Sequence, residues 1–204
     1  LGDAKALIAR EKAGVIKQSI PVIIGETQPE TTSVFKEIAI DNNAPIVFAD
    51  QLERADYISD LKGVYQQKNI QTAVTAIHNL KGFSISKKHI EDGLKNVVSN
   101  TGLLGRWQIL SQEPYTVCDT AHNEEGLTYT LTQIQEQTFH KLHLVLGFVN
   151  DKNLEKLITL FPKNASYYFC KPNIARGLDE TILLTMFKDC GYNGVAYKSV
   201  KEAF

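Results

Sequence analysis

The pentapeptide Asp119-Thr120-Ala121-His122-Asn123 holds the most informative group of chemically competent side chains in this sequence. It lies between a predicted strand and a predicted helix, at the carboxyl edge of a predicted parallel sheet. Open α/β folds bind ligands at this edge, beside helix N-termini that attract phosphate. Asp119 can accept hydrogen bonds from a ribose or orient a basic group, and His122 can donate to a phosphate oxygen. The spacing also fits a capping Asx turn with a solvated histidine.

A second candidate is the arginine in the segment 102–107. Gly102 and Gly105 allow the backbone to bend, and Arg106 offers a planar fork of donors that suits phosphate. The same residues fit an ordinary linker with an exposed arginine.

Two further residues stand at predicted helix ends. Lys12 falls in the last turn of a predicted helix over 3–13, where a cation usually complements the negative end of the helix. Asn69 begins a predicted helix over 69–80, where it is a candidate N-cap, although its amide can also contact the edge of a base.

The elements that must position these residues alternate between helix and strand. In the first part of the chain, apolar spacing predicts a helix over 3–13, a strand over 20–24, a helix over 29–41 and a strand over 46–48. For residues 50–68 the sequence predicts short strands or irregular chain. Helices over 69–80 and from the N-cap candidate Ser86 through Val98 follow.

A short polar stretch at 99–102 predicts a domain boundary, which divides the chain into domains over 1–101 and 102–204. After it the pattern predicts strands over 115–118, 142–146, 166–170 and 195–197, and helices after Asn123, over 151–160, over 179–188 and after Ser199. Repeated strand–helix units imply an α/β protein with a parallel, doubly wound sheet. Because the chain starts inside one predicted helix and stops one turn into another, we expect a fragment.

Composition narrows the classes of function. The 22 basic and 23 acidic residues give a net charge of −1, so no general electrostatic attraction to nucleic acid or an anionic membrane is expected. No apolar run approaches the ~20 residues of a membrane span, and no signal peptide is visible. Cys118, Cys170 and Cys190 form no CxxC pair, which predicts small buried thiols that stay reduced in a cytoplasmic protein.

The standard catalytic signatures are missing from the sequence. It contains no G-x-x-x-x-G-K-[ST], no G-x-G-x-x-G, no H-E-x-x-H and no G-x-S-x-G. Composition and motif patterns therefore predict only an α/β protein of ordinary hydrophobicity.

Four segments in this order nevertheless resemble the folylpolyglutamate synthase/dihydrofolate synthase family of the Mur ligase superfamily, in its C-terminal half. They are residues 8–17 after Leu1-Gly2, residues 63–69, residues 105–107 and residues 119–123. Gly147 with Asp151-Lys152, and Arg176 before an acidic helix start, are similar to the C-terminal domain of the family.

The resemblance implies a fold and an activity. Residues 1–101 would be the remainder of a P-loop-type central ATPase domain without its P-loop portion, and residues 102–204 a doubly wound, Rossmann-like C-terminal domain that ligates glutamate. The family forms amides at the expense of ATP and Mg²⁺, adding L-glutamate to dihydropteroate or folate through an acyl phosphate. Such enzymes are commonly cytoplasmic monomers whose partners are these small molecules.

The resemblance also implies a role for each matching residue. Asn69 matches an asparagine that contacts adenine, Arg106 an arginine that reaches ATP phosphates across the domain cleft, and Asp119 an aspartate that binds the ribose. His122 matches a catalytic histidine near the phosphates. Lys12 matches a catalytic lysine that is carbamylated, which turns its ammonium into an anion that can ligate magnesium through oxygen.

Two positions depart from the pattern of the family, and two other functions stay open. Leu104 replaces a proline before the glycine-arginine pair, and Glu124 replaces a proline after His122-Asn123. Because the P-loop is missing, we expect that this chain alone does not transfer phosphate from ATP. The alternatives are a Mur-type ligase acting on a peptidoglycan precursor and a non-catalytic nucleotide-binding fragment.

Overall fold

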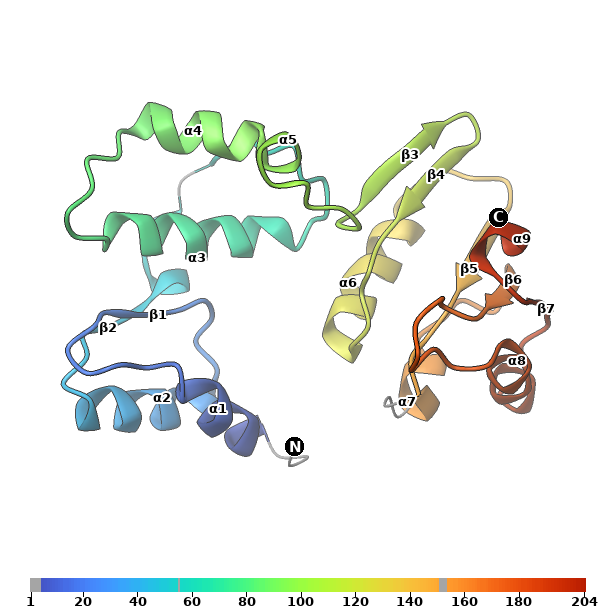
Figure 1. Cartoon of the computed structure of the whole chain (residues 1–204), viewed down its shortest axis with the longest axis horizontal. Coiled ribbons are helices and arrows are strands. Elements are labelled where there is room, and N and C mark those ends of the chain that lie inside the picture. The colour runs from blue at the N-terminus through green and yellow to red at the C-terminus, as the bar shows by residue number, and fades with distance from the viewer. Residues whose placement is uncertain (1–4, 55, 151–153) are drawn as a thin grey trace. The chain divides into compact units, whose positions relative to one another are not determined.

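The computed structural model describes residues 5–54, 56–150 and 154–204. The chain divides into two compact units, Leu1–Val117 and Cys118–Phe204, and each is described by itself (Figure 1).

The first unit begins with the predicted strand–helix–strand arrangement. Its elements are α1 (Lys5–Ala13), β1 (Val22–Ile24), α2 (Pro29–Asp41) and β2 (Ile46–Phe48). The two strands pair in parallel, as expected. A two-stranded sheet is marginal by itself, so helices must cover it. Figure 1 shows α1 and α2 on one side of the strand pair and α3 (Gln66–His78) on the other.

Apolar packing and surface charge join the first helices to the strands. A small cluster of buried residues connects them: Ala13, Ile16, Ala39 and Ala44. Exposed ion pairs from Lys5 to Glu30 at 3.0 Å and from Arg10 to Glu37 at 3.2 Å connect α1 to α2. Pairs this exposed contribute little, so the cluster provides most of the stability here.

The segment between β2 and α3 is irregular apart from one 3₁₀ turn at Ala49–Gln51, so the short strands that we allowed for do not form in its described residues. Side chains hold it in place. The Asp50 carboxylate accepts from the Thr27 backbone N–H at 2.8 Å and from the Thr27 hydroxyl at 2.9 Å. These bonds tie the loop after β1 to the end of β2.

Three helices follow where two were predicted. They are α3, α4 (Lys87–Lys95) and α5 (Val97–Thr101). Ser86 caps α4 as expected, and His89 completes a capping box with it. The predicted continuous helix breaks at Asn96, whose φ of −128° and ψ of 30° are not helical. Ile70 and Val74 of α3 pack on Ile90 of α4.

The strands β3 (Gln108–Gln112) and β4 (Tyr115–Cys118) form a two-stranded sheet, and the division between the units falls before the last residue of β4. The strand β4 was predicted, but β3 was not. All five residues of β3 are exposed or half-buried, so its sequence lacks the contrast between a buried and an exposed face that identifies a strand.

The second unit confirms the predicted parallel α/β sheet. It consists of α6 (Glu124–Gln135), β5 (Leu142–Leu146), α7 (Leu154–Ile158), β6 (Ala165–Cys170), α8 (Glu180–Asp189), β7 (Gly194–Tyr197) and α9 (Val200–Ala203). The strands pair in parallel in the order β5-β6-β7. The caps that begin α6, α8 and α9 are the side chains of Asn123, Asp179 and Ser199.

Aromatic rings fill the core of the second unit. The Phe169 and Phe187 ring centroids lie 4.7 Å apart, and neither residue is exposed. The Tyr192 hydroxyl donates to the carbonyls of Ile158 and Phe161 at 2.8 and 2.9 Å. Burial and the neighbouring Tyr192 raise the pKa of Tyr167, whose hydroxyl donates to the Pro162 carbonyl. The polar ends of these rings are thus satisfied inside the core.

The cysteines differ from the expectation of three buried thiols. Cys170 is buried, and burial raises the pKa of its thiol; Cys118 is half-buried and Cys190 exposed.

No helix in the part of the chain that the structure describes is long and apolar enough to cross a membrane.

We predict that Leu183→Ala lowers the free energy of unfolding of the second unit by about 2–5 kcal/mol, because Leu183 is completely buried and its removal leaves a cavity. Urea unfolding followed by near-ultraviolet circular dichroism measures this. Ile182→Ala is the matched control on the same helix, since Ile182 is 52% exposed. Equal losses in the two variants would contradict the placement of α8.

Candidate functional site

The loop between β4 and α6 is a fixed turn built by two of its own side chains. Asp119 Oδ1 accepts from the Ala121 backbone N–H at 2.8 Å, which forms the expected Asx turn. Asn123 Oδ1 accepts from the Gly126 N–H at 2.8 Å and caps α6, as predicted. A Cβ on Gly126 would lie 2.9 Å from that same oxygen. The loop therefore presents its polar groups at the N-terminus of α6, where the macrodipole favours anions.

His122 is oriented by a single defined bond. Its Nδ1 lies 3.0 Å from the Thr120 carbonyl oxygen, and the residue is exposed. A carbonyl oxygen can only accept, so Nδ1 carries the proton. This leaves Nε2 as the nitrogen that can accept when the ring is neutral or donate when it is charged. The Asx turn and a ligand-facing histidine are therefore compatible.

The Asp119 carboxylate is half-buried and accepts from the Ala121 N–H. A carboxylate has about four acceptor positions on its two oxygens, so it is a chemical group that can accept the hydroxyl groups of a ribose.

Arg106 lies on a tightly bent backbone in the first unit. Gly102, Gly105 and Trp107 have φ values of 68°, 67° and 50°, so the expected bending at the glycines is confirmed. The Gly105 N–H donates to Gln108 Oε1 at 3.1 Å, and Arg106 Nη1 donates to the Gly105 carbonyl at 3.1 Å. A left-handed tryptophan costs on the order of 1–3 kcal/mol, which its surroundings must offset.

A pocket of about 230 Å³ adjoins this bend. Arg106 and Trp107 line one side, and Asp60 and Lys62 come from the segment before α3. Asp60 Oδ2 accepts from the Val98 N–H at 2.9 Å, which caps α5, while Asp60 Oδ1 is buried without a hydrogen-bond partner. Sequence reasoning missed Asp60, because its partner lies 38 residues away and no local signal links them.

Asn69 is placed differently from the capping prediction. Helix α3 begins at Gln66 with Tyr65 as its N-cap, so Asn69 lies inside the first turn and the N-cap interpretation is wrong. Its Nδ2 donates to Gln66 Oε1 at 2.9 Å, and the residue is exposed. The neighbouring Lys68 contacts Glu26 after β1 at 2.7 Å. An exposed amide on a fixed first turn can still bind the edge of a base.

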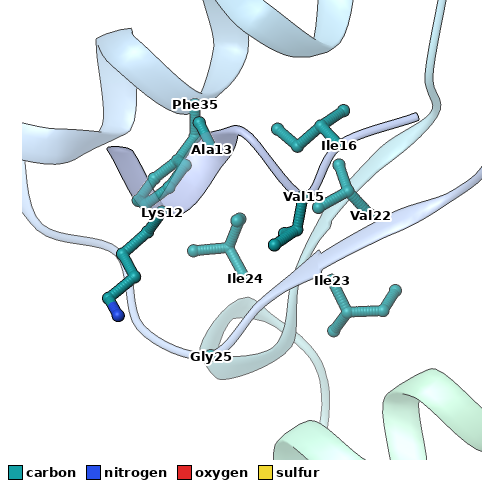
Figure 2. A pocket seen from close by; sticks show the side chains of 9 residues that line it. All are labelled: Lys12, Ala13, Val15, Ile16, Val22, Ile23, Ile24, Gly25 and Phe35. Atoms are coloured by element: carbon teal, nitrogen blue, oxygen red, sulfur yellow. The ribbon is translucent and has the colours of Figure 1, made fainter. Parts of the chain in front are cut away.

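Lys12 lies in the last turn of α1, as predicted, and its side chain is exposed. It lines a pocket of about 310 Å³ with apolar residues of α1, β1 and α2. Figure 2 shows its amino group directed away from Val15, Ile16 and Ile23. A carbamate on Lys12 would offer oxygen to magnesium, but the other residues lining this pocket offer no second side-chain oxygen. The described residues contain no group of three or more His, Cys, Asp or Glu that could hold a metal. Lys12 alone therefore does not form a magnesium site.

The expected residues thus fall into separate groups. Asp119 and His122 share one loop of the second unit. Arg106 shares a pocket with Asp60 and Lys62 in the first unit, while Lys12 lines a different pocket there.

Comparison with known proteins defines the class. Residues 105–204 match the family described as Mur ligase, glutamate ligase domain, and this part of the chain belongs to that family. The second unit, with its parallel sheet and capped loop, lies entirely inside the match.

The relatives confirm the resemblance found in the sequence. The chain is 30% identical over 213 residues to a probable bifunctional folylpolyglutamate synthase/dihydropteroate synthase of Haloferax volcanii, covering 92% of this chain and 25% of that protein. It is 26% identical to the dihydrofolate synthase/folylpolyglutamate synthase of Escherichia coli, covering 100% of this chain and 50% of that protein. The chain thus corresponds to the C-terminal half of such a synthase.

Solved structures agree on the fold. The E. coli FolC structure in complex with DHPP and ADP superposes with a TM-score of 0.79 at 25% identity, over 100% of this chain and 50% of that one. A Mycobacterium tuberculosis folylpolyglutamate synthase complexed with ADP and AMPPCP gives 0.86 at 20% identity, covering 100% and 52%. The predicted fold class is confirmed.

We predict that the neutral His122 ring carries its proton on Nδ1, because the Thr120 carbonyl can only accept. Long-range ¹⁵N–¹H NMR correlations of the imidazole nitrogens measure the tautomer. His89 is the internal control with the opposite assignment, since its Nδ1 accepts from the Ser86 N–H at 3.3 Å and the proton must be on Nε2. A proton on Nε2 of His122 would contradict the loop geometry.

Proposed function

We propose that the protein carrying this chain is an ATP-dependent ligase that joins L-glutamate to dihydropteroate, folate or both. The loop of Asp119 and His122, fixed at the N-terminus of α6 inside the matched domain, is the observation that carries the proposal. The names of the relatives support the substrate class. A bifunctional folylpolyglutamate synthase/dihydrofolate synthase of the same fold has been solved with Mn, AMPPNP and L-glutamate bound.

The chemistry requires activation of a carboxylate. The terminal phosphoryl group of ATP passes to the substrate carboxylate and forms an acyl phosphate, with ADP as the leaving group. The amine of glutamate then attacks the acyl carbon, the new amide loses a proton, and inorganic phosphate leaves. Charge crowds on the transferring phosphoryl in this sequence, so fixed donors and cations around the phosphates accelerate it.

In this proposal His122 and Asp119 hold the nucleotide from the second unit. The charged His122 ring, fixed through Nδ1, donates from Nε2 to a phosphate oxygen, while Asp119 accepts from the ribose hydroxyls. Both groups keep their geometry without a ligand, because the bonds that orient them are made to their own loop. Such preorganisation lowers the entropy lost on binding.

Arg106 and Asn69 hold the nucleotide from the first unit. Arg106 supplies a planar, permanently charged fork to the phosphates, and Asn69 contacts the adenine edge with its exposed amide. Neither residue belongs to the three apolar clusters among the described residues.

Lys12 is proposed as a carbamylated lysine that contributes one oxygen to magnesium. When bound, magnesium offsets the negative charge of the transferring phosphoryl. Because this ion prefers about six oxygen ligands, the remaining ligands must come from the substrate, water or other parts of the protein.

A ligation assay tests the substrate class. The protein, as expressed from its gene, receives ATP, L-glutamate and either dihydropteroate, folate or a nucleotide-linked peptidoglycan precursor, and products are identified by mass spectrometry. The proposal expects glutamylated pteroate or folate. Product from the peptidoglycan precursor alone would assign a Mur-type ligase. Nucleotide binding without any product would leave a non-catalytic module.

We predict that Arg106→Ala raises the KM for ATP about tenfold or more, because a charge-assisted fork to phosphate is lost. Steady-state ligation rates measure it, with thermal unfolding as a check that the fold persists. Arg54→Ala is the matched control, since Arg54 is an exposed arginine paired with Gln67 and Asp56. An unchanged KM in Arg106→Ala would remove this residue from the site.

We predict that Lys12→Ala lowers the ligation rate and that a short carboxylic acid restores part of it, because the acid replaces the anionic oxygen of the carbamate. Rates with and without added acetate test this. Lys5→Ala, which changes another exposed lysine of α1, should keep its rate. A Lys12→Ala rate equal to that of the wild type would exclude a role for the carbamate.

A further inference from the structure

The backbone of Trp107 has a conformation that bulky residues rarely adopt. Its φ of 50° lies in the left-handed region, which glycine and asparagine tolerate far better than an aromatic residue. The side chain is nevertheless buried, with 3% of its surface exposed. A residue persists in such a conformation only where its surroundings over-determine it, and such positions concentrate at functional sites.

Trp107 is buried outside the three apolar clusters among the described residues. It lines the pocket of about 230 Å³ together with Asp60, Val98 and Leu103. Trp107 is therefore a buried residue of the bend after α5 and not a member of a described apolar cluster.

The two residues on either side of Arg106 each have a constrained backbone or side chain. Gly105 is left-handed and its N–H is bonded to the Gln108 side chain, while Trp107 is left-handed and buried. Arg106 is the half-buried residue between these two fixed points. The backbone on either side consequently fixes the direction in which the Arg106 side chain leaves the main chain.

We infer that Trp107 is a positioning residue for Arg106: the buried indole holds the strained bend that aims the guanidinium, an inference that rests on the phosphate-binding role proposed for Arg106 above. A flexible arginine must be ordered before its fork can bind phosphate in two places. An anchored backbone removes part of that cost in advance.

The variant Trp107→Gly removes the buried ring and also removes the steric strain of the left-handed backbone. Glycine adopts a φ of 50° without steric penalty, so this variant keeps the bend accessible while it loses the ring and the restriction that the ring places on the backbone. Trp107→Phe keeps an aromatic anchor. Leu104→Ala, at a residue that is 60% exposed in the same segment, is the matched control.

A double-mutant cycle with Arg106→Ala tests the coupling. Calorimetry with magnesium-ATP on the protein as expressed from its gene is expected to show that Trp107→Gly and Arg106→Ala each weaken binding about tenfold. The double variant should bind no more weakly than Arg106→Ala alone. Trp107→Phe and Leu104→Ala should bind as the wild type does.

Outcomes that overturn the inference differ from those that overturn the proposed function. Additive losses in the double variant, or wild-type binding by Trp107→Gly, show that Trp107 does not act through Arg106. Wild-type binding by Arg106→Ala removes the proposed role of Arg106 in phosphate binding, and the inference falls with it.

A second measurement tests the positioning role of Trp107 without any ligand. The Nε–Hε NMR signal of Arg106 should be dispersed in the wild type and in Trp107→Phe, and should move to the position of a disordered arginine in Trp107→Gly. An unchanged signal in Trp107→Gly would refute the positioning role.

Discussion

Parallel pairing is the constraint on which the rest of this structure depends. A parallel sheet is covered by its crossover helices, so its strands are apolar and its polar chemistry is confined to the loops at the strand ends. In the second unit, β6 buries Tyr167 and Phe169 against α8, and Gly194 of β7 leaves room for them. A Cβ on Gly194 would lie 2.5 Å from the Phe169 ring. The sheet thus leaves little space for a polar site within the core.

The candidate site uses loops that are rigid for local reasons. Asp119 and Asn123 hold the loop before α6 through bonds to backbone N–H groups within three residues. The bend at Arg106 is instead held by two left-handed residues and a buried ring. In both loops a polar side chain stands on a fixed backbone. Less conformational entropy is then lost when a charged ligand binds.

Local signals explain which predictions succeeded. Asn123, Ser86 and Asp179 are caps because their side chains bond to N–H groups two or three residues on, and such contacts are readable in the sequence. The prediction that Asn69 is an N-cap was wrong because α3 begins one turn earlier. Its N-cap is Tyr65, whose side chain makes no capping hydrogen bond. The break at Asn96 was not predicted, because it does not interrupt the apolar pattern of the helix. The strand β3 was not predicted, because it adds no apolar pattern of its own.

The sequence by itself determined the alternation of strands and helices, the caps, and the ordered motifs that point to the Mur ligase family, because each depends on residues within a few positions of one another. Only the tertiary structure decided what surrounds Arg106. Asp60 reaches Val98 across 38 residues, and Trp107 is buried in a left-handed conformation that no residue pattern announces. Contacts between distant segments depend on how the chain packs, and packing is a property of the whole fold.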